Sequence, residues 1–82
     1  MRIISQNKAC DIPYKKSALT IQKVNENSYN INGFLSDRYF CLGSYKDMNH
    51  AKAVLWAIAS NFREGKKYFE MPQTDEDLTC IQ

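Results

Sequence analysis

Alternating apolar and polar positions through the first half of the chain predict a series of short β-strands. The predicted strands are residues 2–5, 10–14, 18–24, 29–32 and 38–45. Pro13 confines the second of them to a sheet edge or the end of a hairpin, because it has no amide hydrogen to donate. Residues 25–27 are expected to form a hairpin loop, and residues 33–37 the next turn. Short connections between consecutive strands favour an antiparallel meander.

The last of these predicted strands carries aromatic side chains on both faces. By strict alternation, Phe40 and Leu42 share one face, and Tyr39, Cys41 and Tyr45 share the other. A strand of this kind is expected to be covered, at least partly, on both sides.

An amphipathic helix is the clearest element in the sequence. Asp47 is a suitable N-cap, because its carboxylate can accept hydrogen bonds from the first-turn amides, and Gly65 is expected to end the helix. Apolar residues recur at the spacing of one helical face: Ala51, Val54, Leu55, Ile58 and Phe62. This face is expected to lie across the sheet, over Leu19, Ile21, Ile31, Phe40 and Leu42.

The chain after the helix predicts one more extended segment and a short tail. Residues 68–71 are expected to be extended, Pro72 ends them, and Thr74 with Asp77 could cap a single helical turn. A chain of 82 residues fits one domain, residues 1–82, with a thin core. The predicted fold class is α+β: an antiparallel β-meander of four to five strands, one amphipathic helix packed on one face, and a short C-terminal tail.

Composition is typical of a globular protein and not of a disordered or fibrous one. Hydrophobic residues make up 44% of the chain and charged residues 24%. The longest apolar run, Ala53 to Ala59, is far shorter than the roughly 20 residues that span a bilayer. No basic-then-apolar leader precedes the first strand. The sequence therefore predicts neither a membrane segment nor a signal peptide.

The net charge of +2 is unevenly distributed along the chain. Residues 1–23 carry five bases and one acid, and residues 46–67 carry five bases and two acids. The last fifteen residues carry four acids and no base. Nucleic-acid-binding proteins usually show a denser basic stripe, and the acidic end would repel phosphates. Direct binding to nucleic acid is therefore not expected.

The three cysteines and the single histidine support two interpretations. An odd number of cysteines without a leader favours reduced thiols, and free cysteines commonly pack as small buried hydrophobes. Alternatively, Cys10, Cys41, Cys80 and His50 together make a complete Cys₃His set for one tetrahedral structural zinc ion. Their spacing contains no Cys-x-x-Cys pair, so the packed-thiol interpretation is the favoured one.

Motifs for catalysis are not found. The three glycines stand alone, so no glycine-rich phosphate loop is present, and no Ser or Cys is placed beside His50 as a nucleophile in the sequence. The sequence therefore predicts a protein without catalytic residues, and not an enzyme.

The outer face of the predicted helix is a candidate docking surface. Trp56 lies well away from the core positions and shares a flank with Lys52 and Arg63. Tryptophan and arginine are enriched at the energetic centres of protein interfaces, and the small residues Ala53, Ala57 and Ser60 on the back of the helix would let a partner approach closely. The alternative, slightly favoured, is that Trp56 folds down over the sheet edge and closes the core.

Three segments resemble small proteins encoded by phages and prophages of Gram-positive bacteria. They are the opening Met-Arg-Ile-Ile-Ser-Gln, the segment Asp-Ile-Pro-Tyr at 11–14, and Tyr-Phe-Glu-Met-Pro at 68–72 with acids after it. The resemblance extends over essentially the whole chain, and none of it is a catalytic signature. This chain departs from the pattern by having Lys15 and Lys16 where an acid often follows the Pro-Tyr pair.

The resemblance implies a binding protein that acts in the cytoplasm of a bacterial host. Counter-defence proteins of phages, including anti-CRISPR inhibitors of type II RNA-guided nucleases, are similar in size and in lacking catalytic motifs. The first hypothesis is therefore a stoichiometric inhibitor that blocks guide or target DNA loading on the host effector nuclease, with Trp56, Lys52 and Arg63 as contacts. The acidic residues 75–77 would be a weak mimic of phosphate charge.

Two other functions stay open. A nucleotide second-messenger sponge would need converging bases and aromatic rings, with Arg2, Lys15, Arg38 and the tyrosines as candidates across an oligomer interface. The third possibility is a phage accessory or structural protein. The oligomeric state does not follow from the sequence.

Overall fold

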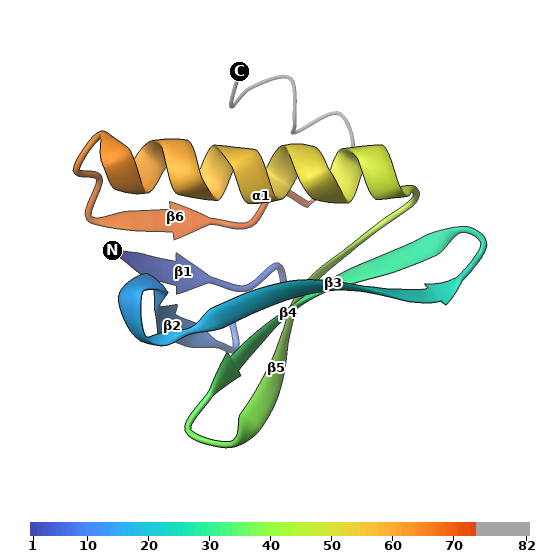
Figure 1. Ribbon diagram of the computed structural model, residues 1–82, viewed down its shortest axis with the longest axis horizontal. Coiled ribbons are helices and arrows are strands. Elements are labelled where there is room, and N and C mark those ends of the chain that lie inside the picture. Colours follow the sequence, from blue (N-terminus) through green and yellow to red (C-terminus); the bar gives the residue numbers. More distant parts are fainter. Residues whose placement is uncertain (74–82) are drawn as a thin grey trace.

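The computed structural model describes residues 1–73, whose strands form two three-stranded sheets beside one α-helix (Figure 1). In chain order the elements are β1 (Arg2–Ile4), β2 (Asp11–Pro13), the 3₁₀ turn η1 (Tyr14–Lys16), β3 (Ala18–Asn25), β4 (Ser28–Leu35), β5 (Arg38–Tyr45), α1 (Met48–Arg63) and β6 (Tyr68–Glu70). The predicted α+β class, with a meander and one helix packed on a sheet, is confirmed. The prediction placed four to five strands in one meander, but the meander contains only β3, β4 and β5, and β1, β2 and β6 form a second sheet.

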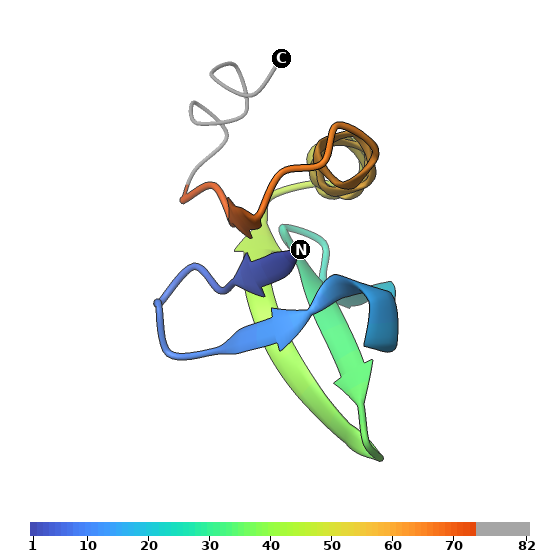
Figure 2. The same cartoon turned by 90° about the vertical axis from the view of Figure 1, so that its left-hand side faces the viewer.

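The smaller sheet joins the two ends of the described chain. Its order is β2-β1-β6, with β1 antiparallel to β2 and parallel to β6. Ile3, at the centre of β1, is flanked by Ile12 on one side and Phe69 on the other, and all three are buried. Figure 2 views α1 nearly end-on and shows β6, β1 and β2 following one another away from the helix. β2 is an edge strand, as Pro13 predicted.

The larger sheet is the antiparallel meander β3-β4-β5. Its second turn is tighter than predicted, because β4 continues through Gly33 to Leu35 and only Ser36 and Asp37 form the loop. Both loop residues have positive φ, 52° and 64°, which is the backbone of a type I′ hairpin turn. The predicted turn over 33–37 contains the observed one but began too early, because Gly33 was taken for a turn residue although it lies within β4.

A β-bulge in β5 reverses the alternation of its side chains. Ile31 pairs with Gly43 but Asn32 pairs with Cys41, so one extra residue of β5, Leu42, is accommodated between them. Tyr45 is consequently buried on the core side, 3% exposed, whereas the sequence placed it with Tyr39 on the opposite face. The second face of this strand was expected to be at least partly covered, and its cover is slight: Tyr39 contacts the Phe34 ring but is 68% exposed.

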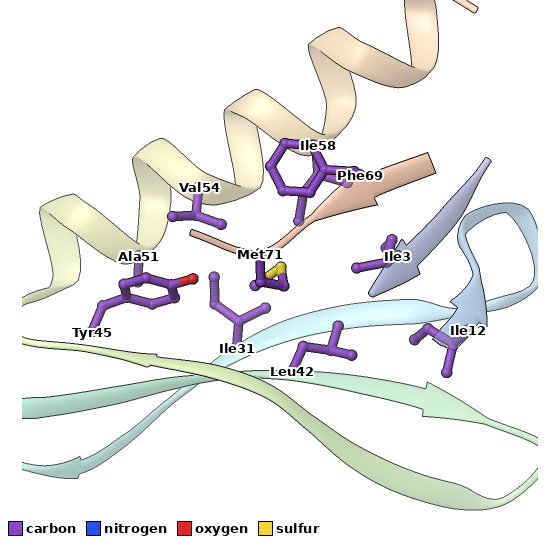
Figure 3. Packing of buried hydrophobic residues seen from close by; sticks show 10 residues of the cluster. All are labelled: Ile3, Ile12, Ile31, Leu42, Tyr45, Ala51, Val54, Ile58, Phe69 and Met71. Atoms are coloured by element: carbon purple, nitrogen blue, oxygen red, sulfur yellow. The ribbon is translucent and has the colours of Figure 1, made fainter. Parts of the chain in front are cut away.

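The core lies between α1, the small sheet and one face of the meander (Figure 3). The buried side chains are Ile3, Ile12, Ile31, Leu42, Tyr45, Ala51, Val54, Ile58, Phe69 and Met71. The predicted sheet positions under the helix are confirmed: Ile31 and Leu42 are buried, while Leu19, Ile21 and Phe40 are half-buried against the same cluster. Phe69 and Met71, which follow the helix, fill space that the meander alone would leave open.

The helix begins and ends near the positions that the sequence indicates. The Asp47 side chain accepts a hydrogen bond from the backbone N–H of His50 at 2.9 Å, as an N-cap does. After Arg63 the chain turns at Gly65, whose φ of +79° favours glycine. No helix in residues 1–73 has the length and apolar character needed to cross a membrane. The predicted helical turn at Thr74 and Asp77 lies outside the described residues.

Candidate functional site

Trp56 lies on the outer face of α1, with 67% of its surface exposed. The helix packs on the core through Ala51, Val54 and Ile58, which are fully buried, and its periodicity carries Trp56 away from them. The alternative in which Trp56 closes the core over the sheet edge is therefore wrong. Most of the Trp56 surface is therefore open to solvent in the described part of the fold.

Lys52 and Arg63 complete a cationic and aromatic stripe with Trp56 on the outer face of the helix. Lys52 precedes Trp56 by one turn, Arg63 follows it by two turns, and both side chains are exposed. No residue from Met48 to Arg63 is acidic, so the stripe contains no opposite charge of its own. We call Lys52, Trp56 and Arg63 the tryptophan stripe.

The small residues expected on the back of the helix are only partly exposed. Ala53, Ala57 and Ser60 are all half-buried, and Ala57 packs against the core cluster. The free surface beside Trp56 is therefore narrower than a helix in isolation would present. It is also fixed in position, because the opposite side of α1 is anchored in the core.

Residues 1–73 contain no group of three or more His, Cys, Asp or Glu side chains that could hold a metal ion. Cys10 is half-buried at the end of the turn that joins β1 to β2, whereas Cys41 is exposed on β5. His50 lies in the first turn of α1, with its Nδ1 atom 3.1 Å from Asp47 Oδ2. Cys80 lies outside the described residues. A zinc ion bound by all four residues stays a prediction.

Three of the residues considered for a nucleotide site, Arg2, Arg38 and Tyr45, are engaged in separate local contacts, whereas Tyr14 and Lys15 lie together beside Phe62. Arg2 pairs with Asp11 at 2.8 Å, and the Arg38 guanidinium lies 5.8 Å from the centre of the Phe40 ring. The Tyr45 hydroxyl donates a hydrogen bond to the Pro72 carbonyl at 2.8 Å within the core. Stacking of a base on Tyr45 would therefore require the core to open. No two of these three are brought together by a contact in the described structure.

The sequence reasoning did not identify the polar face of the meander. A shallow hollow of about 680 Å³ is lined by Thr20, Gln22, Asn30, Asn32, Tyr39 and Cys41. The Asn32 side-chain amide donates a hydrogen bond to the Gln22 side-chain oxygen at 2.8 Å. The centroids of the Phe34 and Tyr39 rings are 4.7 Å apart. The alternation of polar positions in two adjacent strands was the signal available for this face.

Neither a protein-family model, nor a curated protein, nor a solved structure matches this chain.

Proposed function

We propose that this protein is a non-enzymatic inhibitor that docks on another protein through the tryptophan stripe. The observation that carries the proposal is the 67% exposure of Trp56 on a regular, well-anchored helix. Exposed tryptophan is costly in water, and its large amphipathic ring gains much of its value when an interface covers it. The two flanking cations favour an acidic surface on the partner.

The anchoring of α1 supports tight binding. Ala51, Val54 and Ile58 hold the inner side of the helix in the core, so the outer side is ordered before the partner arrives. A partner then does not have to supply the free energy needed to order the helix, which is a major cost when flexible segments bind. A preorganised surface favours stoichiometric inhibition, which needs no catalytic residue.

The partner to test first is a type II RNA-guided nuclease of the bacterial host. This target comes from the resemblance of residues 1–6, 11–14 and 68–72 to phage proteins, and makes the protein an anti-CRISPR inhibitor. Occupation of a surface that the nuclease needs for guide or target DNA loading would block interference sterically. The exposed cations of the stripe add a contact for acidic side chains on the nuclease.

Trp56→Ala tests the proposal directly. Loss of an interface tryptophan typically costs about 2 kcal/mol or more, or roughly 30-fold in affinity. Co-elution with purified type II nucleases and protection of a targeted plasmid in cells are the two readouts. Tyr39→Ala is the matched control, because Tyr39 is equally exposed, at 68%, on another element.

The expected result is that the unmodified protein and Tyr39→Ala protect the plasmid while Trp56→Ala does not. Unchanged interference across a panel of type II nucleases would reject this target. Equal protection by Trp56→Ala and the unmodified protein would reject the stripe as the docking surface.

A further inference from the structure

We propose that the docking face includes a shallow, open groove beside the tryptophan stripe, with aromatic and aliphatic walls and polar edges, and that this groove receives a bulky apolar side chain from an acidic segment of the partner. The inference rests on the proposed docking function and adds the chemistry of what is recognised. The groove is lined by Tyr14, Lys15, Ser17, Leu19, Leu55 and Phe62 and has a volume of about 470 Å³.

Two aromatic rings form a wall of the groove. The centroids of the Tyr14 and Phe62 rings are 4.8 Å apart and their planes are inclined by 39°. Leu19 and Leu55, from β3 and α1, add aliphatic surface. Both rings and both leucines are only half-buried, so apolar surface remains for an incoming side chain.

Backbone contacts hold the η1 side of the groove in place. The Tyr14 amide donates a hydrogen bond to the Met1 carbonyl at 2.9 Å, and the Ser17 hydroxyl donates one to the Pro13 carbonyl at 2.6 Å. The opposite side belongs to α1, which is anchored in the core. The groove is therefore formed before a partner binds.

Helical periodicity makes the groove continuous with the tryptophan stripe. Leu55 and Phe62 of the groove are the sequence neighbours of Trp56 and Arg63, about 100° around the helix axis. Between these two rows lies Ala59, which is small and half-buried. One partner segment can thus contact the groove and the stripe together.

The charges around this combined surface select an acidic occupant. The Lys15 ammonium lies 5.7 Å from the centre of the Phe62 ring, at the groove itself, and Lys52 and Arg63 lie on the stripe. None of the groove or stripe residues is acidic. A Phe or Leu side chain would fill the apolar part, and neighbouring Asp or Glu side chains would meet the three cations.

Trp56 is the only tryptophan of the chain, so its fluorescence reports on this surface alone. The probe is a twelve-residue synthetic peptide with a central phenylalanine flanked by glutamates. We expect a saturable change of Trp56 emission, and at least tenfold weaker binding when the phenylalanine is replaced by alanine or the glutamates by lysines. No saturable change, or equal binding of the lysine peptide, would overturn the inference.

Lys15→Glu and Leu55→Gln test the groove from the side of the protein. Each substitution is expected to lower the affinity for the peptide at least fivefold. Circular dichroism checks that each variant keeps the fold. Lys23→Glu is the control, because it makes the same charge change at an exposed position of β3 outside the groove. Unchanged affinity in both groove variants would overturn the inference.

Two further probes test whether the groove binds nucleic acid or the acidic end of this chain in place of a partner protein. An oligothymidylate that changes the emission as strongly as the acidic peptide would assign the surface to nucleic acid and overturn the inference. A peptide of residues 74–82 that displaces the probe would assign the groove to the acidic end of this chain, with the same consequence. If Trp56→Ala abolishes nuclease inhibition while both groove variants retain it, the groove inference fails and the docking function stands.

Discussion

The absence of a side chain at Gly33 lets the two sheets pack closely against each other. A β-carbon built on Gly33 would collide with the Cδ1 atom of Ile12, so β2 of the small sheet lies directly against β4 of the meander at this point. Gly33 is buried in the middle of a strand, where glycine normally weakens a sheet, and the close approach explains its presence. In the sequence the same glycine suggested a turn.

Gly33→Ala is expected to lower the free energy of unfolding by about 1–3 kcal/mol, because the new methyl group overpacks a filled site. Chemical denaturation would measure the loss. Ile12→Val removes the colliding Cδ1 atom, so the cost of Gly33→Ala should be smaller in the Ile12→Val background. Strict additivity of the two changes would contradict the proposed contact.

Gln6 ties the two sheets to the end of the described chain. Its side-chain nitrogen lies 2.8 Å from the Pro72 carbonyl and 3.2 Å from the Gln73 carbonyl, while its side-chain oxygen accepts the Ser44 amide at 2.9 Å. The Gln6 backbone amide also donates to the Leu42 carbonyl at 2.7 Å. One amide side chain therefore satisfies backbone groups from segments that are far apart in the sequence.

Gln6→Ala should destabilise the fold by about 1 kcal/mol, because the Ser44 amide and the Gln73 carbonyl lose their side-chain partner, while the Pro72 carbonyl keeps the hydrogen bond from Tyr45. Gln6→Glu keeps the shape but places a carboxylate oxygen against the carbonyls that the amide nitrogen now faces, and should cost at least as much at neutral pH. Thermal unfolding measures both variants. Native stability in Gln6→Glu would show that the side-chain donor contributes nothing.

At the scale of elements, the helix follows from local sequence. Asp47 caps its first turn, the buried positions follow a 3.6-residue period, and Gly65 adopts the positive φ after its last turn. These signals act over a few residues, so they can be recognised without knowledge of the rest of the fold.

Asp47→Ala is expected to cost about 1 kcal/mol, since the first-turn amides lose their side-chain acceptor. Asp47→Asn should retain most of the stability, because asparagine caps nearly as well. For a domain of this size a loss of 1 kcal/mol corresponds to about 4–8 °C in melting temperature. An equal effect of both substitutions would attribute the loss to the charge of Asp47, including its contact with His50, in place of the cap.

The strands were less predictable than the helix because their faces depend on pairing. Alternation assigned Phe40 and Leu42 to the core correctly but failed at Tyr45, since the bulge near Gly43 adds one residue to β5. A bulge is set by the partner strand and by what packs on it, neither of which is local. The same limit applies to the Ser36–Asp37 turn, whose register is fixed by β4 and β5 together.

At the scale of the whole molecule, the parallel pairing of β1 with β6 closes the fold. Arg2 pairs with Tyr68 and Ile4 with Glu70, and the helix provides the crossover that lets a late segment lie beside the first strand. Phe69 and Met71 then complete the core from the end of the described chain. Residues from both ends of the described chain therefore meet in the small sheet.

A structural zinc ion would also join segments that are far apart in the chain. If Cys10, Cys41, Cys80 and His50 bind one, native mass spectrometry should show one zinc per chain, and a chelator should lower the melting temperature sharply because metal binding contributes directly to folding. Cys41→Ser should then cause a comparable loss. An unchanged melting temperature after chelation, and a mass without metal, would reject the zinc site. The packed-thiol interpretation is already wrong for Cys41, because Cys41 is exposed on β5.

The sequence alone determined the α+β class and the helix with its cap and its end, because these depend on periodicity and on contacts within a few residues. The tertiary structure decided which strands pair, where Tyr45 points and that Trp56 remains exposed. It also created the groove, whose walls Tyr14 and Phe62 are far apart in the chain and meet only when η1 and α1 pack together. Pairing and packing involve distant segments, and one-dimensional patterns do not encode which of them meet.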